Sequence, residues 1–186
     1  MQLKLYVTRH GETDYNVSGR YAGSTDVPLN KKGIEQAKNL AGHLSNIKFD
    51  VIVSSSMLRA RQTADVICQS LGLQYSVSDC FVERHLGVYE GLTRDEVKTQ
   101  YPEMWNRRCT TLPDDAPEGG ETLRQACERV DRGLEHLRLF YGDKCVLLIC
   151  HGLVARAVHR YCKNLAYDEM SGFVLNNCEI VDYTLE

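Results

Sequence analysis

The chain has 186 residues, of which 43% are hydrophobic, and its 22 basic and 25 acidic side chains give a net charge of −3. This length fits one domain with a continuous core. The charge balance excludes a broad basic face for nucleic acid or an anionic membrane, so any anion site must be local. With neither a secretory signal nor an apolar run long enough to span a bilayer, we expect a cytoplasmic protein.

Eight cysteines raise the question of disulfides or a metal site. None belongs to a CxxC pair or a Cys/His cluster, and several lie in apolar runs, where free cysteine behaves as a small hydrophobe. Without a secretory signal, we expect reduced structural thiols. The cysteines are Cys68, Cys80, Cys109, Cys127, Cys145, Cys150, Cys162 and Cys178.

The first expected strand, Leu3 to Val7, breaks into Thr8, Arg9, His10 and Gly11. In an open α/β sheet, ligands bind at the carboxyl ends of the strands. Arg9 offers a fork of donors suited to phosphate or carboxylate, and Gly11 lets the backbone turn sharply beside a ligand. This strand exit therefore indicates an anionic substrate.

After a loop, Asn30 is expected to cap a helix that runs to about Ser45. A second strand, Phe49 to Val53, ends in a run of three serines, which we expect to cap a helix from Met57 to about Leu71. Arg59 lies near the start of that helix, where free N–H groups and the helix dipole also favour an anion.

The middle of the chain is expected to hold a third strand, Gln74 to Val77, followed by short and irregular elements. We expect the region of about residues 79–120 to be a helical and loop insertion that covers the site. Its expected parts are an irregular segment at 79–91, short helices at 92–101 and 102–108, and a loop at 112–120.

A long amphipathic helix is expected from Glu121 to about Phe140, and the most strongly apolar strand from Cys145 to Cys150. This strand exits into His151 and Gly152 and is followed by a helix from Leu153 to Tyr161. The last segments, 173–175 and 180–185, flank two asparagines and are expected to form a terminal hairpin or edge pair.

Strands that alternate with helices predict an α/β domain spanning 1–186. The expected fold is a three-layer α/β/α arrangement with a mostly parallel central sheet and an antiparallel edge strand. Three strands then bring Arg9 with His10, Arg59 and His151 to the same sheet edge. This convergence suits phosphoryl transfer, with His10 as the nucleophile and positive donors around the phosphoryl oxygens.

The departing alcohol needs a proton, and the water that attacks later must lose one. A single carboxyl group of raised pKa can do both, and Glu83 is the candidate. Glu90 competes with Glu83 for this role, and the register of the motif below favours Glu83.

At these residues the chain resembles the histidine phosphatase superfamily, specifically its phosphoglycerate mutase-like branch. The resemblance covers nearly the whole chain in order. It rests on the motifs TRHGETDYN (8–16), SSSMLRARQTA (54–64), ERHLGVYEGLT (83–93), PEGGET (117–122) and CHGLVAR (150–156).

The resemblance implies that His10 is the phosphorylated nucleophile and Glu83 the general acid and base. It implies a phosphate pocket of Arg9, Arg59 and His151, with no cofactor and no metal. Further substrate or phosphate contacts are implied for Asn16, Gly23, Arg84, Arg107, Arg108 and the backbone near Leu153.

We expect hydrolysis of small phosphorylated metabolites, similar to alpha-ribazole phosphatase and the broad-specificity phosphatases of the family. A phosphoglycerate mutase that interconverts 3- and 2-phosphoglycerate is the first alternative. The resemblance implies that the mutases of the family are longer chains whose C-terminal tail covers the site. This difference in length favours the phosphatase. The second alternative is an inactive relative that binds phosphorylated ligands. No nucleic-acid or membrane partner is expected, a homodimer is allowed for, and the natural substrate stays open.

Overall fold

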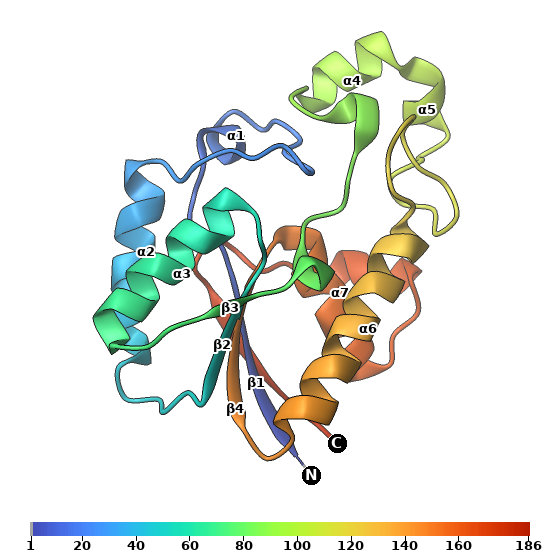
Figure 1. Cartoon of the computed structure of the whole chain (residues 1–186). Helices are drawn as coiled ribbons and strands as arrows, with labels where there is room; N and C mark the ends of the chain where they lie inside the picture. The colour runs from blue at the N-terminus through green and yellow to red at the C-terminus, as the bar shows by residue number, and fades with distance from the viewer. Residues whose placement is uncertain (1) are drawn as a thin grey trace.

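The computed structural model describes residues 2–186 and has a five-stranded sheet at its centre (Figure 1). The strands lie in the order β3-β2-β4-β1-β5, and every neighbouring pair is parallel except β1 with β5. The predicted mostly parallel sheet with an antiparallel edge strand is confirmed. The strands are β1 (Leu3–Arg9), β2 (Val51–Ser54), β3 (Ser76–Val77), β4 (Cys145–Cys150) and β5 (Ile180–Leu185).

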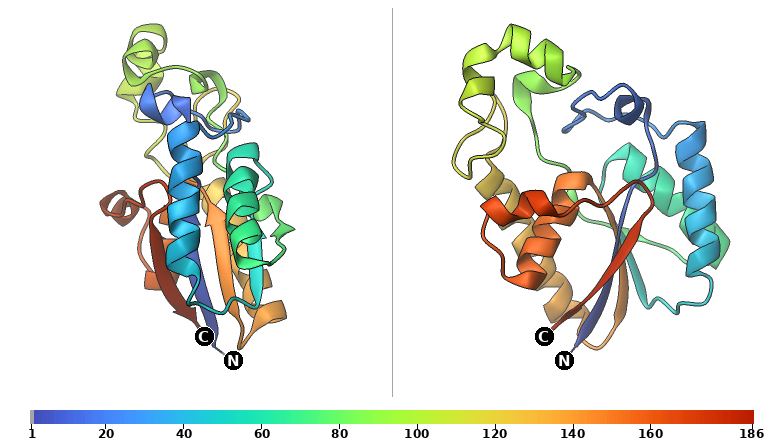
Figure 2. Two further views of the ribbon diagram at one scale, coloured as in Figure 1. Left: turned by 90° about the vertical axis from the view of Figure 1, so that its left-hand side faces the viewer. Right: turned by 180° about the vertical axis from the view of Figure 1, so that it is seen from behind.

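Helices cover both faces of the sheet, as Figures 1 and 2 show. Because successive side chains of a strand point to opposite faces, β4 serves two cores. Val146 and Leu148 pack toward α6 and α7, whereas Leu147 and Ile149 pack toward α2 and α3. The predicted three-layer architecture is confirmed. The covering helices are α2 (Lys31–Leu44), α3 (Leu58–Leu71), α6 (Leu123–Tyr141) and α7 (Gly152–Lys163).

The helix starts follow the sequence in one case and depart from it in another. Asn30 caps α2 by accepting a hydrogen bond from the Gly33 amide at 2.8 Å, as predicted. The expected serine cap of α3 is wrong, because the residue at the N-cap is Met57, which makes no side-chain cap bond. The Ser55 hydroxyl, 3.3 Å from the Met57 amide, is instead also 2.8 Å from a ring nitrogen of His151.

The insertion at residues 79–120 lies over the carboxyl ends of the parallel strands, at the end of the molecule opposite the two termini (Figure 1). It has a small core of its own, in which Tyr89, Val97 and Cys109 are buried. It contains the 3₁₀ turns η1 (Asp79–Phe81) and η2 (Gly87–Tyr89) and the short helices α4 (Arg94–Gln100) and α5 (Pro102–Asn106). A short helix that the sequence did not predict, α1 (Asp14–Val17), lies beside it.

The C-terminal segment forms an edge strand and no hairpin. A 3₁₀ turn, η3 (Asp168–Gly172), precedes residues 173–175, which pair with no strand. Their carbonyl groups accept arginine side chains instead: Phe173 from Arg156 Nε at 3.1 Å and Leu175 from Arg9 Nη1 at 3.3 Å. This segment therefore braces the edge of the sheet where β1 ends.

The eight cysteines all carry free thiols. Across residues 2–186 no helix is long and apolar enough to cross a membrane. Within the same range, no group of three or more His, Cys, Asp or Glu side chains is arranged to hold a metal ion.

Candidate active site

Two histidines leave neighbouring parallel strands at the same edge of the sheet. The last residues of β1 and β4, Arg9 and Cys150, are paired in register, and the His10 amide donates to the Cys150 carbonyl at 3.0 Å. The rings of His10 and His151 are both buried, with centroids 5.2 Å apart. The structure thus brings together the two histidines that the strand pattern singled out.

The His10 ring is held in one tautomer. Its Nδ1 lies 2.7 Å from the Gly11 carbonyl oxygen, and because a carbonyl only accepts, Nδ1 carries the hydrogen. Nε2 is left with its lone pair and has no hydrogen-bond partner among the described residues. Burial, reinforced by the charges of Arg59 and Arg9, holds the pKa of His10 well below its ordinary value, so the ring is neutral at neutral pH.

The turn after His10 is fixed against two helices. The Gly11 amide donates to the Thr63 hydroxyl of α3 at 3.0 Å, and that hydroxyl donates to the Arg59 carbonyl at 2.8 Å. On the side of α2, a Cβ placed on Gly11 would lie only 2.4 Å from the Gly33 carbonyl oxygen. The backbones of the turn and of α2 meet here without room for a side chain. This contact fixes the position of His10 at the end of β1.

Two arginines, the buried Arg59 and the half-buried Arg9, flank the histidines. Arg59 donates through its terminal nitrogens to the carbonyls of Thr25 at 2.8 Å and Gly23 at 2.9 Å. Burial lowers the pKa of Arg9 and of Arg59, but a guanidinium stays charged across the physiological range. The site is therefore a buried positive pocket.

Three polar atoms of this pocket are buried without a hydrogen-bond partner: Nε of Arg9, Nε of Arg59 and Nδ1 of His151. An unsatisfied buried polar group costs about 1–3 kcal/mol. A tetrahedral oxyanion such as a phosphoryl group can accept from several donors at once, and would remove this cost. The arrangement is chemically suited to binding one.

His151 is oriented by a residue that the sequence analysis did not single out. Its Nε2 lies 2.8 Å from the hydroxyl of Ser55, which follows β2 at the same sheet edge. Burial first, and then the neighbouring positive charges of Arg59 and Arg9, hold the pKa of His151 well below its ordinary value. The serine run after a strand was the available signal, but it was interpreted as a helix cap.

Glu83 lies at the N-terminus of α7. Its carboxylate accepts from the amides of Arg84 at 3.0 Å and Leu153 at 3.2 Å. The carboxylate of Glu90, the competing candidate, binds other groups: it accepts hydrogen bonds from the amides of Leu86 and Ser24. Burial alone would raise the pKa of Glu90, but these bonds outweigh it and lower the pKa.

Two of the other expected binding residues, Asn16 and Arg84, form hydrogen bonds within the protein. Asn16 joins a polar cluster, since its side-chain oxygen accepts from the Thr13 amide and from Asn177, which also donates to the His10 carbonyl at 2.8 Å. Arg84 is buried and its guanidinium donates to three backbone carbonyls, those of Glu121, Thr110 and Asp115.

Arg107 and Arg108 point to different surroundings. Arg107 is bound by the Asp115 carboxylate through two nitrogens, at 2.6 and 3.2 Å. Arg108 lines a cavity of about 840 Å³ between the insertion and the start of α7. Only the second residue of this basic pair is therefore available to a ligand in the cavity.

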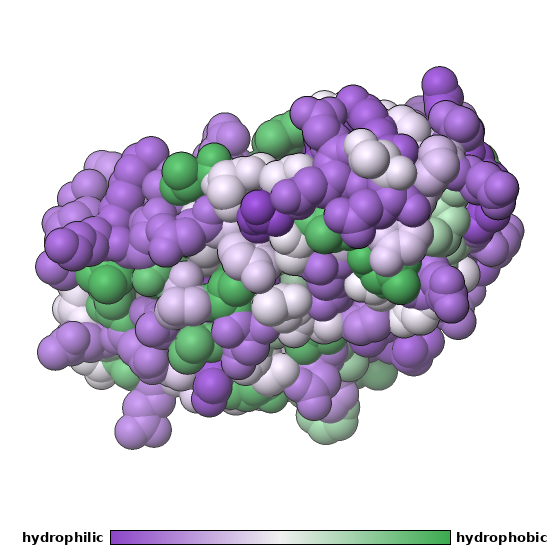
Figure 3. Space-filling view, turned by 90° about the horizontal axis from the view of Figure 1, so that it is seen from above, coloured by the Kyte–Doolittle hydropathy of each residue, from purple (hydrophilic) through white to green (hydrophobic). Residues whose placement is uncertain are grey.

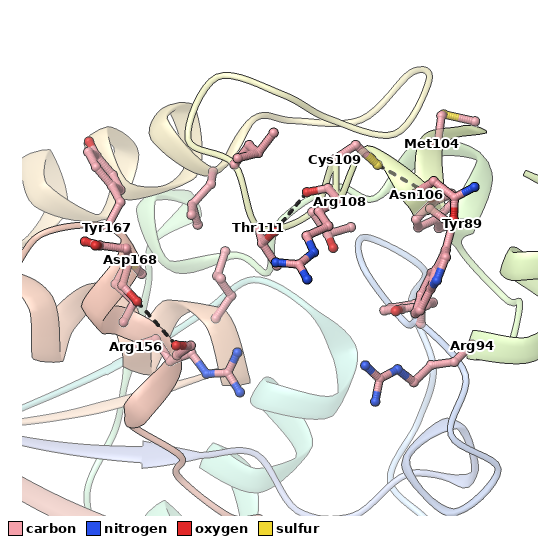
Figure 4. Close-up of a pocket in the computed structure, with 18 residues that line it drawn as sticks. Tyr89, Arg94, Met104, Asn106, Arg108, Cys109, Thr111, Arg156, Tyr167 and Asp168 are labelled. Carbon is pink, nitrogen blue, oxygen red and sulfur yellow. Dashed lines mark hydrogen bonds between the residues drawn. The ribbon is translucent and has the colours of Figure 1, made fainter. Parts of the chain in front are cut away.

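Three arginines and one carboxylate, that of Asp168, line the cavity, so its net charge is positive. Arg94, Arg108 and Arg156 direct their guanidinium groups into it from three sides (Figure 4). Unlike Arg107, none of the three forms an ion pair with a carboxylate of residues 2–186. Leu153, whose amide contacts Glu83, also lines the cavity, which therefore adjoins the histidine pocket. From above, this end of the molecule is mostly hydrophilic, with hydrophobic residues in small separate patches (Figure 3).

Comparison with known proteins gives a consistent picture. The family described as the histidine phosphatase superfamily (branch 1) matches residues 5–186. Phosphoserine phosphatase 1 of Hydrogenobacter thermophilus is 33% identical over 98% of this chain and 85% of its own. The probable phosphoglycerate mutase GpmB of Escherichia coli is 32% identical over 97% and 85%. The structure of the alpha-ribazole phosphatase of Shigella flexneri superposes with a TM-score of 0.89 at 26% identity, covering 96% and 89% of the two chains.

Proposed function

We propose that this chain, which belongs to the histidine phosphatase superfamily, hydrolyses small phosphomonoesters through a phosphohistidine on His10. One observation carries the proposal. The His10 ring is neutral, donates from Nδ1 to the Gly11 carbonyl, and keeps the lone pair of Nε2 free beside Arg9, Arg59 and His151. In-line attack on phosphorus requires a neutral imidazole surrounded by hydrogen-bond donors, and here two of the donors are positively charged arginines.

The reaction has two displacements. In the first, Nε2 of His10 forms a bond to phosphorus as the bond to the alcohol oxygen breaks, and Glu83 donates a proton to that oxygen. In the second, Glu83 takes a proton from water, the water oxygen attacks phosphorus, and the phosphorus–nitrogen bond breaks. Arg9, Arg59 and His151 stabilise the charge on the phosphoryl oxygens in both steps.

We assign the other expected binding residues by their contacts. Arg84 braces the insertion and presents its own amide to Glu83, so it acts as a positioning residue. Asn16 supports the backbone of His10 through Asn177. Gly23 contributes its carbonyl to Arg59.

The alcohol part of the substrate occupies the cavity between the insertion and α7. Arg94, Arg108 and Arg156 line it without carboxylate partners, which favours an alcohol that itself carries an anionic group. Residues 79–120 then serve as a cover that selects the alcohol, while the sheet edge binds the phosphoryl group.

The contacts of the basic pair Arg107 and Arg108 favour the phosphatase over the mutase. A mutase must hold the acid group of a phosphoglycerate while it returns the phosphoryl group, and the resemblance assigns that task to Arg107 and Arg108. Arg107 is neutralised by Asp115, which leaves one member of the pair. The similarity to GpmB keeps the mutase as the second candidate.

Phosphate release from a panel of phosphorylated metabolites by the wild type and by His10→Ala tests the proposal. We expect release by the wild type and loss of at least about 1000-fold in the variant, since the nucleophile is removed. If the wild type released no phosphate but interconverted 3- and 2-phosphoglycerate when primed with the bisphosphate, the mutase would replace the phosphatase. Binding of phosphate without turnover of either kind would identify an inactive relative.

A further inference from the structure

Glu90 is a largely covered carboxylate that the proposed reaction does not use. It lies in the insertion, directly after the turn η2, and only 13% of its side chain is exposed. Its carboxylate accepts from the Leu86 amide at 3.0 Å, the Ser24 amide at 2.7 Å, the Ser24 hydroxyl at 3.0 Å and the Thr25 hydroxyl at 2.9 Å. All but one of these donors belong to a single short loop, residues 23–25.

The same loop holds Arg59 on its other side. The Gly23 carbonyl accepts from Arg59 Nη2 at 2.9 Å, and the Thr25 carbonyl accepts from Nη1 at 2.8 Å. The loop thus turns its amide and hydroxyl groups toward a carboxylate and its carbonyl groups toward a guanidinium. Each contact polarises the peptide groups in the sense that strengthens the other.

The backbone of the loop and the carboxylate of Glu90 are in close contact. Gly23 has a φ of +49°, and a Cβ placed on it would lie 2.1 Å from Glu90 Oε1. A side chain at this position would be strained by the positive φ and would displace the Glu90 carboxylate from its contacts with the loop. Tyr21, two residues before the loop, packs against Tyr89 with ring centroids 5.8 Å apart, and both tyrosines line the cavity.

We propose that Glu90 is a positioning residue for the phosphate pocket: it fixes loop 23–25, and the loop fixes the guanidinium of Arg59. This inference rests on the proposed function only in giving Arg59 a phosphoryl group to bind. It explains why a carboxylate of the insertion is anchored to a loop of the sheet edge. The two halves of the site, cavity and phosphate pocket, are held in register by this link.

A double-mutant cycle tests the proposal. Glu90→Gln is expected to lower kcat/KM about tenfold in the wild-type background, because a misplaced guanidinium loses its alignment with the phosphoryl oxygens. In an Arg59→Ala background the same change is expected to cost less than about twofold, because its target is gone. The loss should be equal for substrates with good and poor leaving groups, since Glu90 acts on the phosphoryl side. Equal losses in both backgrounds would overturn the proposal.

A matched control separates positioning from loss of fold. Glu96→Gln removes another carboxylate of the insertion, one that binds Arg20 and caps α4 without touching loop 23–25. It is expected to leave kcat/KM within about twofold of the wild type. If Glu90→Gln fails to fold, Ser24→Ala removes the hydroxyl contact at an exposed residue and should lower kcat/KM in the same direction by about threefold. No loss in Ser24→Ala would then overturn the proposal.

The Arg59 Nε–H signal in a nitrogen-15 NMR spectrum of the free protein gives a readout that needs no substrate. We expect Glu90→Gln to shift or broaden this signal and Glu96→Gln to leave it in place. An unmoved signal in Glu90→Gln would overturn the proposal even if the wild type proved inactive. A moved signal in a protein without phosphatase activity would keep the link and refute only the proposed function.

Discussion

Replacing Gly11 by alanine tests how tightly the turn after His10 is fixed. The added Cβ would lie 2.4 Å from the Gly33 carbonyl oxygen and 2.9 Å from its carbon. Because these atoms belong to the backbone of α2, the clash is relieved only by moving the turn or the helix. Overpacking of this kind destabilises by about 1–3 kcal/mol. A displacement of His10 by about 1 Å would lower kcat by about 100-fold.

Urea unfolding and phosphatase kinetics measure the two effects in one preparation. Gly42→Ala is the matched control. Gly42 lies in α2, the helix that contains Gly33, and a Cβ added to it would have no other atom within 4 Å. The control is expected to gain about 0.5–1 kcal/mol of stability, because alanine favours the helix, with unchanged kcat. If Gly11→Ala kept both the stability and the kcat of the wild type, the argument that this contact fixes His10 would be refuted.

Three further predictions concern the proton donor, the cavity and the buried histidines. Glu83→Gln should slow hydrolysis most for poor leaving groups and least for nitrophenyl phosphate; a uniform loss would contradict its role as the acid. Arg108→Ala should raise KM about tenfold for substrates with a second anionic group, and Arg107→Ala less than about twofold because Asp115 occupies it; the reverse order in initial-rate assays would contradict the cavity assignment. His10 and His151 have depressed pKa values when folded, so below pH of about 6.5 the unfolded chain binds more protons. As the pH falls below this value, the free energy of unfolding should decrease by up to about 1.4 kcal/mol per pH unit for each histidine. Urea titrations at a series of pH values would contradict this if the stability stayed constant between about pH 7.5 and 5.5.

Much of the fold follows from local patterns in the sequence. The helical spacing after Asn30 extends over enough residues for its period to identify a helix. The continuous apolar run Cys145–Cys150 is identified as a buried strand by its short length. The helix α1 was missed because it has four residues, held by a capping box between Thr13 and Asn16 rather than by an apolar face. Of the terminal hairpin or edge pair that the sequence predicts, β5 forms an antiparallel edge strand beside β1. Residues 173–175 form no strand, and the carbonyls of Phe173 and Leu175 accept hydrogen bonds from arginine side chains, a tertiary contact without a local sequence pattern.

The candidate site divides in the same way. Strand order brings His10, Arg59 and His151 together, and a motif at each strand exit was enough to find them. The contacts of Ser55 with His151 and of Glu90 with Ser24 could not be predicted, because each joins residues that lie far apart in the sequence. A charged side chain alone does not reveal whether its partner is a ligand or the backbone.

Trapping the covalent intermediate tests the central claim most directly. The wild type is mixed with a substrate labelled on phosphorus, quenched within milliseconds in alkali or acid, and the label on the protein is counted. We expect label that survives alkali and is lost in acid, as expected for a phosphorus–nitrogen bond, and that is absent from His10→Ala. Label that survived acid, or that persisted in His10→Ala, would contradict it.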